Sequence, residues 1–291
     1  MENGYNYLKN WYWNAIVKFN IINYTKNRAV DFIASKSAIS DKITTRARRI
    51  HSVQHFDVVL KSLNCFFQKK IYNMYYSMAE YKEGIPIEVS TFNLRDRDLE
   101  KWNAEHYKNI IGYDFFIDVD SPDFENLEIC FRQTKIICKY LDSIRFPYYL
   151  RFSGKGFHIV TPYKYFKVYD DFNSDIDDVF NPNYDDNIYK LYREIALSIK
   201  YRFTEMIDTT IYDSRRVLKI PFSLAIYKDK TKICCPFSMK YDIQWIEQVC
   251  DFNNYELFFN FLKSGNFRDI LNNPDGDVGL LLKDLKMEKF K

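Results

Sequence analysis

Apolar and aromatic residues recur along this chain at two spacings, one typical of helices and one typical of strands. The helical spacing predicts helices within residues 5–45, including a second helix around 28–38, and at 54–70, 123–144, 188–206 and 254–271. Aromatic and β-branched runs predict strands at 71–79, 113–120, 148–152 and 231–237, and a further strand that carries Arg216 and Lys219. Because strands and helices are interspersed without a repeat, the pattern indicates an α+β fold with a mixed β-sheet and flanking helices.

Changes in this pattern suggest how the chain is divided. Residues 1–43 form a predicted N-terminal helical cap, residues 44–250 a predicted core, and residues 251–291 a C-terminal helix and tail or linker. Within the core, residues 170–187 are acidic, rich in Asn and Asp, and interrupted by Pro182, which favours a solvated loop insertion.

Composition narrows the class of protein. The chain has 291 residues, of which 47% are hydrophobic and 18% aromatic, so it is long and apolar enough for one large or two small globular domains. Net charge is only +3, from 42 basic and 39 acidic residues, so a nucleic-acid partner would need a local basic surface. The six cysteines form no Cys-x-x-Cys pair, and we predict no zinc site. Scattered thiols, and the lack of a signal peptide or membrane-length apolar run, favour a cytoplasmic protein without a membrane partner.

One predicted strand, Tyr113–Asp120, carries clustered acidic residues. Side chains alternate along a strand, so Asp118 and Asp120 share a face, with Asp114 behind them. Neighbouring carboxylates repel, and a divalent cation with hard oxygen ligands, Mg²⁺ or Mn²⁺, relieves that repulsion. The alternative is a strand end at which both carboxylates reach water, and an isolated Asp-x-Asp is compatible with either.

A second motif, Ser153-Gly154-Lys155-Gly156-Phe157-His158, follows the next predicted strand. The glycines let the backbone approach an anion closely, and their amides can form a phosphate nest. Lys155 and His158 would add charge-assisted hydrogen bonds. An ordinary hairpin turn has the same composition, and this alternative stays open.

Two further segments bring charged residues to the predicted core. Asp208 precedes a strand that carries Arg216 and Lys219, so a third carboxylate would complete a metal site and the cations would hold a triphosphate. Earlier in the chain, alternation places Arg46 and Arg48 on one strand face, where they would contact phosphates. A solvated basic loop explains those two arginines equally well.

The order of the three motifs, Phe116–Asp120, Ser153–His158 and Ile207-Asp208, strongly resembles the archaeo-eukaryotic primase superfamily, which includes primase small subunits and primase-polymerases. That family is marked by an hDhD strand, an SxxxxH-type nucleotide loop and a later hD. Weaker matches are Tyr75–Tyr81 and the basic segment Arg46–His51. The likeness spans about residues 44–238 and implies the catalytic core of that superfamily.

The resemblance implies roles for individual residues. It makes Asp118, Asp120 and Asp208 the ligands of two Mg²⁺ or Mn²⁺ ions. The implied nucleotide-binding residues are Ser153, Gly154, Lys155, Gly156, His158, Arg216, Lys219 and Ser223. The implied template contacts are Arg46, Arg48 and Arg49, and candidates for seating a second nucleotide are Arg95, Arg97, Lys155 and the Arg46–Arg49 cluster.

This sequence departs from the family pattern in two places. Ala225 stands where primase small subunits usually have a histidine, and Lys228 or Lys230 would have to substitute for it. The zinc module of archaeal and eukaryotic primase subunits has no counterpart. The lack of the zinc module favours the stand-alone primase-polymerases of plasmids, viruses or bacteria, including those linked to CRISPR systems.

The resulting hypothesis is a template-dependent nucleotidyltransferase that synthesises and extends primers by two-metal catalysis. Its partners would be a single-stranded DNA template, a primer strand and an NTP or dNTP, and the resemblance allows an additional domain or a replication or CRISPR partner protein. The alternatives are a two-metal nuclease, a rolling-circle replication initiator, or an inactive nucleic-acid-binding subunit. An initiator would need two histidines flanking an apolar residue, and only His158 lies in such a strand; three well-placed aspartates argue against an inactive subunit.

Overall fold

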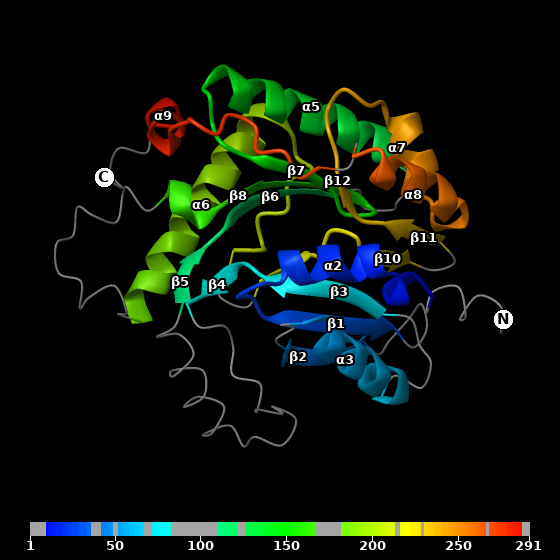
Figure 1. Ribbon diagram of the computed structural model, residues 1–291. Helices are drawn as coiled ribbons and strands as arrows, with labels where there is room; N and C mark the ends of the chain where they lie inside the picture. Colours follow the sequence, from blue (N-terminus) through cyan, green and yellow to red (C-terminus); the bar gives the residue numbers. More distant parts are fainter. Residues whose placement is uncertain are drawn as a thin grey trace. The chain divides into compact units, whose positions relative to one another are not determined.

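The computed structural model describes residues 10–35, 42–48, 52–66, 72–82, 110–120, 126–166, 182–212, 216–227, 230–265 and 268–286. It divides into two compact units (Figure 1). Unit 1 comprises Met1–Ile111 and Val217–Cys234, and unit 2 comprises Gly112–Arg216 and Cys235–Lys291. Both contain helices and antiparallel sheets, which confirms the predicted α+β class. The predicted division at residues 43 and 250 stays a prediction.

Unit 1 is built on a four-stranded antiparallel sheet with the strand order β2-β1-β3-β9. Its strands are β1 (Val30–Ser35), β2 (Lys42–Arg48), β3 (Tyr72–Ser77) and β9 (Val217–Lys219). Val30 lies opposite Tyr76 on β3, and Tyr76 lies opposite Leu218 on β9. All three side chains are buried, so this register forms one layer of the core of unit 1.

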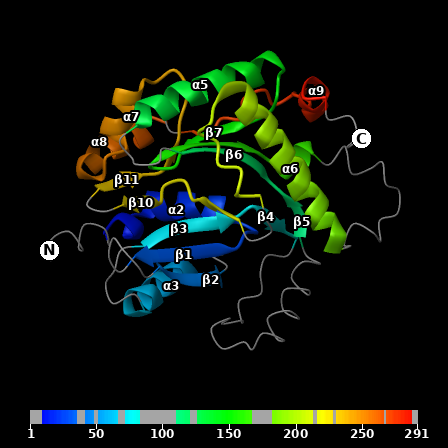
Figure 2. The same cartoon turned by 180° about the vertical axis from the view of Figure 1, so that it is seen from behind.

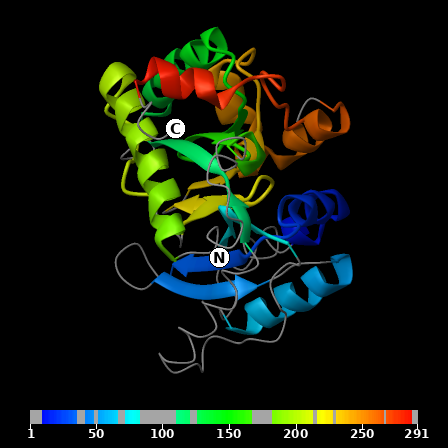
Figure 3. The ribbon, with the colours of Figure 1, turned by 90° about the vertical axis from the view of Figure 1, so that its left-hand side faces the viewer.

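Two helices of unit 1 lie on the same side of strands β1 and β2 (Figure 3). They are α2 (Ala15–Tyr24) and α3 (Val53–Phe66), and an ion pair between Lys18 and Asp57 joins them. The prediction of a helix around 28–38 is wrong, because residues 30–35 of that segment form β1. Three apolar residues within four positions, Val30, Phe32 and Ile33, fit either the helical or the strand period, and pairing with two neighbouring strands decides for a strand.

Trp11 and Tyr12, near the start of the described chain, are bonded to the turn that precedes β10 (Leu224–Tyr227) of unit 1. The indole Nε1 of Trp11 donates to the carbonyl of Phe222 at 2.9 Å, and the Tyr12 hydroxyl accepts from the amide of Leu224 at 3.0 Å. Phe222 has a φ of 69°, a conformation that bulky residues rarely adopt. The two bonds therefore hold a strained turn at the start of the hairpin formed by β10 and β11 (Lys230–Ile233).

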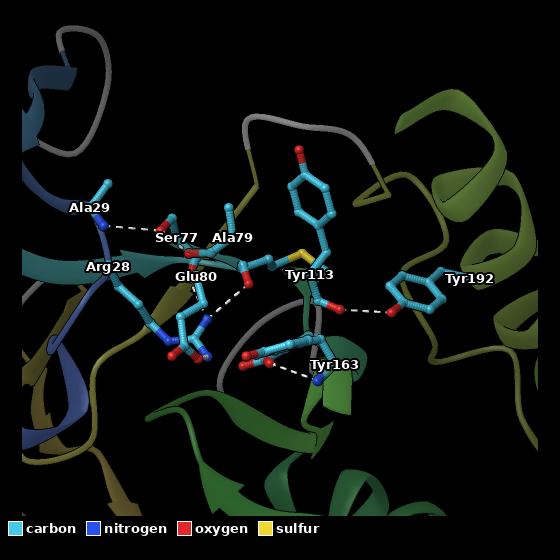
Figure 4. Close-up of polar contacts among 10 residues, drawn as sticks. Arg28, Ala29, Ser77, Ala79, Glu80, Tyr113, Tyr163 and Tyr192 are labelled. Carbon is cyan, nitrogen blue, oxygen red and sulfur yellow. Dashed lines mark hydrogen bonds and ion pairs between the residues drawn. The ribbon is translucent and has the colours of Figure 1, made fainter. Parts of the chain in front are cut away.

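A buried arginine secures the turn between β3 and β4 (Ala79–Tyr81) of unit 1 (Figure 4). Arg28 donates to the carbonyls of Ser77 and Met78 at 3.1 and 2.8 Å and pairs with Glu80 at 3.2 Å. Two carbonyls and a carboxylate therefore balance this guanidinium, which explains how Arg28 is buried inside a small unit.

Unit 2 is built on a second antiparallel sheet with the strand order β12-β7-β8-β6. Its strands are β6 (Phe115–Asp120), β7 (Tyr149–Phe152), β8 (Gly156–Thr161) and β12 (Cys235–Pro236). The short strand β5 (Ile110–Tyr113) precedes β6, and the 3₁₀ turns are η2 (Tyr163–Tyr165) and η5 (Phe252–Asn254).

Helix α5 (Leu127–Ser143) lies along one face of this sheet, and α6 (Pro182–Phe203) runs past β6 (Figures 1 and 2). Phe131 of α5 contacts Phe157 of β8 with ring centroids 5.7 Å apart. Tyr192 of α6 donates from its hydroxyl to the carbonyl of Tyr113 at 2.7 Å (Figure 4). The remaining helices of unit 2 are α7 (Ile243–Val249), α8 (Tyr255–Lys263) and α9 (Val278–Asp284).

The structure refines several predicted boundaries. Helix α6 begins at Pro182, inside the segment predicted as a loop, because proline suits the first position of a helix. Residues 167–181 lie outside the described part. The predicted helix at 254–271 is only α8, and α7 and β10 were missed. Within the described residues, no helix combines the length and apolarity needed to cross a bilayer.

Candidate active site

A row of polar residues crosses the sheet of unit 2 at the acidic strand. Asp118 of β6 lies directly opposite His158 of β8, and His158 lies opposite Arg151 of β7. Opposite residues in an antiparallel pair share a face. The alternate positions, such as Val119 and Phe157, are buried, and Phe157 packs on α5. The sheet therefore carries an apolar face toward α5 and a charged row on its other face.

The third predicted aspartate is brought to β6 by main-chain pairing. The amide of Asp208 donates to the carbonyl of Asp118 at 3.1 Å, and the amide of Asp120 donates to the carbonyl of Met206 at 3.3 Å. Between them, Ile207 forms an antiparallel bridge with Val119. The segment 206–208 thus extends the sheet beyond β6, and Asp118 and Asp208, 90 residues apart in sequence, become neighbours.

Two residues that the sequence analysis missed hold this extra pairing in place. The hydroxyl of Tyr212 donates to the carbonyl of Phe116 at 2.7 Å, and its ring stacks on Phe115. Lys200, in the last turn of α6, donates to the carbonyl of Ile207 at 3.0 Å. Burial raises the pKa of Tyr212, and the carboxylates of Asp118 and Asp208 raise it further, so the hydroxyl keeps its proton and remains a donor.

The carboxylates differ in their surroundings. Asp118 is 14% exposed at its side chain, and Nε2 of His158 stands 3.5 Å from its Oδ1. Burial raises the pKa of Asp118 well above its usual range, and the neighbouring Asp120 raises it further. Asp208 instead accepts hydrogen bonds from the amide and hydroxyl of Thr210 at 2.9 and 2.7 Å.

The glycine-lysine motif forms a hairpin turn between β7 and β8. The Ser153 hydroxyl accepts from the Gly156 amide at 3.1 Å, and the Ser153 amide donates to the Gly156 carbonyl at 3.0 Å. Gly154 has a φ of 98°, which requires glycine. Lys155, at the tip, forms an ion pair with Asp120. The alternative of a hairpin turn is therefore what the structure shows, and the turn lies beside the acidic strand.

Gly156 permits this close approach. A Cβ at residue 156 would lie 2.2 Å from the carbonyl oxygen of Val119 and 2.8 Å from Oδ1 of Asp120. A side chain of any size would therefore push β8 away from β6 at the position where Asp120 lies.

Replacing Gly156 with alanine is expected to lower the free energy of unfolding by about 2–3 kcal/mol, the cost of overpacking a tight interior. Urea unfolding followed by circular dichroism measures this loss. Lys164→Ala is the matched control, because that side chain is exposed in the same unit and its loss should shift stability by less than about 0.5 kcal/mol. Equal stability of Gly156→Ala and the wild type would show that β8 can move away from β6 at this position without loss of stability.

The residues present fit a hard divalent cation by their donor chemistry. Carboxylate oxygens are the ligands that Mg²⁺ and Mn²⁺ prefer. The Oδ1 atoms of Asp118 and Asp120 are buried and accept no hydrogen bond from the described part of the chain. However, no three His, Cys, Asp or Glu side chains among the described residues are already gathered as a metal site. The assignment of Asp118, Asp120 and Asp208 as metal ligands stays a prediction.

The other predicted site residues are distributed over both units. In unit 2, Arg216 donates to the carbonyl of Thr210 at 2.8 Å. In unit 1, the ammonium of Lys219 donates to Asn73 and Tyr75 at 2.9 and 3.1 Å. Ser223, also in unit 1, is fully buried, and its hydroxyl contacts the carbonyl of Met74 at 3.3 Å. Their nucleotide-binding roles stay predictions.

The predicted basic strand is present as β2, which includes Arg46 and Arg48. The structure describes the backbone of this strand but not its side chains. A register irregularity opposite Val30–Phe32 falls between Thr45 and Arg48, so simple alternation does not fix which faces the two arginines occupy. The other predicted cations Arg49, Arg95, Arg97 and Lys228 lie outside the described residues. Ala225 is buried, and Lys230 is exposed at the start of β11.

A further ion pair, which no sequence pattern predicted, lies on the charged face of the sheet. Nη2 and Nε of Arg151 lie 2.6 and 3.4 Å from the Asp269 carboxylate, and both side chains are mostly buried. No local signal joins two residues 118 positions apart, so only the fold could reveal this pair.

No protein-family model and no curated protein sequence matches the chain. Among solved structures, the polymerase domain of Mycobacterium tuberculosis Ligase D in complex with DNA aligns over 90% of this chain and 88% of its own, with 9% identity and a TM-score of 0.45. Similarity at this level does not assign the chain to a family.

Proposed function

We propose that this protein is a nucleotidyltransferase of the primase-polymerase type. The observation that carries the proposal is the meeting of three sequence-distant motifs at one place in unit 2. Strand β6, which carries Asp118 and Asp120, pairs directly with β8, in which the Ser153–His158 motif ends. The segment that ends at Asp208 pairs with the opposite edge of β6. These are the motifs on which the sequence resemblance to the archaeo-eukaryotic primase superfamily rests.

In this proposal the three aspartates hold two Mg²⁺ or Mn²⁺ ions. When bound, the ions would supply Lewis-acid activation of a 3′-hydroxyl and neutralise charge on a triphosphate. Asp118 and Asp120 are suited to this role because each presents a buried oxygen that accepts no hydrogen bond from the described residues. Tyr212 and Lys200 act as positioning residues, because they fix the segment that carries Asp208.

The turn and the charged row are the proposed nucleotide contacts. His158 stands beside Asp118, so an imidazole donor lies next to the carboxylates where a metal-bound triphosphate would be anchored. Lys155 brings a flexible positive charge to the same carboxylates. The finer proposals are a single-stranded DNA template, a primer strand and an NTP or dNTP as substrates, with primer synthesis as well as extension.

One assay distinguishes this function from its rivals. The full chain is incubated with a single-stranded template, with or without an annealed labelled primer, and with NTPs or dNTPs plus Mg²⁺ or Mn²⁺. Products longer than the primer, or new oligomers without it, are expected on a denaturing gel. An end-labelled template tested in parallel reports cleavage. Shortened template without extension would instead indicate a nuclease, and a template shift without either product would indicate a binding subunit.

A further inference from the structure

A positively charged side chain, that of Lys155, already contacts one of the proposed metal ligands. The ammonium of Lys155 forms an ion pair with Oδ2 of Asp120, whose side chain is 18% exposed. The other oxygen of the same carboxylate is buried and accepts no hydrogen bond from the described residues. One lysine therefore neutralises the carboxylate that the proposed function assigns to a divalent ion.

The backbone of Lys155 is held in place by the turn, whereas its side chain can move. Residues Ser153 and Gly156 close the turn with two hydrogen bonds, and Gly156 is packed directly against β6. The Lys155 side chain is nevertheless 45% exposed. Its long flexible stem lets the ammonium move by several ångströms without any movement of the main chain.

An ammonium and a divalent cation cannot both bind Asp120 closely in the absence of other negative charge, because like charges at this separation repel. A triphosphate changes the balance. Its oxygens offer ligands to the metal and hydrogen-bond acceptors to the lysine, so both cations are then stabilised.

We propose that Lys155 is an internal counter-cation that competes with the divalent ion for Asp120 in the absence of nucleotide and moves to the triphosphate when a nucleotide binds, leaving the carboxylate to the metal. The inference rests on the proposed function. Metal and nucleotide binding are therefore positively coupled through one side chain.

The first test compares Mn²⁺ binding to nucleotide-free wild type, Lys155→Met and Lys164→Met, using electron paramagnetic resonance of free Mn²⁺. Lys155→Met is expected to bind Mn²⁺ about fivefold more tightly, the upper end for release of a partly exposed ion pair. The same variant should bind Mg²⁺–dATP more weakly by calorimetry. Lys164 is the matched control, because it is exposed in the same unit and stands over the Tyr165 ring, so its loss should change neither affinity.

The second test follows the ammonium directly. Lysines are reductively methylated with formaldehyde and cyanoborohydride, and the Lys155 peptide is quantified by mass spectrometry. Labelling of Lys155 is expected to rise about twofold or more when Mg²⁺ is added alone, because displacement from Asp120 frees the amine, and to fall when Mg²⁺ and dATP are added together. Labelling of Lys164 should stay constant throughout.

The possible outcomes distinguish a failure of the role proposed for Lys155 from a failure of the proposed function. Mn²⁺ binding that is equal in wild type and Lys155→Met, or that shifts equally in Lys164→Met, overturns the role of Lys155 and leaves the proposed function standing. Lys155 labelling that does not respond to Mg²⁺ also overturns it. If neither wild type nor any variant binds Mn²⁺, the metal site and the proposed function fail together.

Discussion

Replacing Asp120 with asparagine is expected to reduce nucleotide incorporation by about 10³-fold or more, because a lost metal ligand removes several kcal/mol of transition-state stabilisation. Asp118→Asn should have an effect of the same size. Both residues lie on β6, which pairs with the segment that carries Asp208. In the proposed site each aspartate supplies a separate ligand, so the loss of one is not compensated by the other. Primer extension measured at saturating nucleotide and metal provides the rates.

The matched control is Asp275→Asn, which removes one exposed carboxylate from the same unit and should leave incorporation unchanged. Circular dichroism of each variant shows whether the fold persists. Extension rates of Asp118→Asn and Asp120→Asn within a factor of two of the wild type would exclude these aspartates as ligands of catalytic ions.

Asp118→Asn is also expected to change how the stability of the metal-free protein depends on pH. Because the pKa of Asp118 is raised in the folded protein, folding takes up a proton there, and the ionised carboxylate destabilises the fold. The penalty is absent below the unfolded pKa of about 4. It grows as pH rises toward the folded pKa and is complete above it. Metal-free Asp118→Asn should therefore be more stable than the wild type at pH 7 to 8, and the two should converge near pH 3.

Replacing Asp269 with alanine is expected to lower the free energy of unfolding by about 3–5 kcal/mol, because it leaves the guanidinium of Arg151 buried without its carboxylate partner. Arg151 is 7% exposed and lies on the central part of the sheet, between His158 and the strand β12. The segment that carries Asp269 is also bonded to the residue just before β7, through reciprocal backbone hydrogen bonds between Tyr148 and Asn272 at 3.1 and 2.8 Å. Urea unfolding measures the loss.

A paired replacement tests the physical cause. If the penalty comes from an uncompensated charge, Arg151→Met combined with Asp269→Leu should recover most of the stability that Asp269→Ala loses, because apolar residues of similar volume can replace a buried ion pair. Asp275→Ala, on the exposed turn that follows, should cost less than about 0.5 kcal/mol. A loss below 1 kcal/mol in Asp269→Ala would mean that water reaches Arg151.

The sequence carried enough information for the fold class and for the acidic strand. Alternation within Tyr113–Asp120 predicts a strand with two carboxylates on one face, and β6 has this form. The Ser153–His158 motif follows a strand, β7, as predicted. Its glycines were predicted to approach an anion, and the structure shows other reasons for them, a positive φ at Gly154 and a close approach to β6 at Gly156. Such features are local, so they depend on residues a few positions apart.

The remaining features depend on contacts between distant segments. Val30–Ile33 reads as helix or strand until β3 is available as a partner. Tyr212 is one of 24 tyrosines, and nothing near it in sequence distinguishes the hydroxyl that bonds the Phe116 carbonyl. The ion pair of Lys155 with Asp120 likewise joins two motifs that the sequence presents as separate sites.

The order of the segments has a consequence for how the protein is made. Strand β9 completes the sheet of unit 1 beside β3, yet about 140 residues separate Ser77 from Val217. At ~5–20 residues per second, a ribosome needs about 7–28 s to translate that interval. During this time the nascent chain presents β3 as an unprotected strand edge, which is a template for pairing with other chains. A gene fragment truncated before residue 217 should therefore yield aggregated rather than folded protein, and slower translation of the middle of the gene should lower the yield of the full chain.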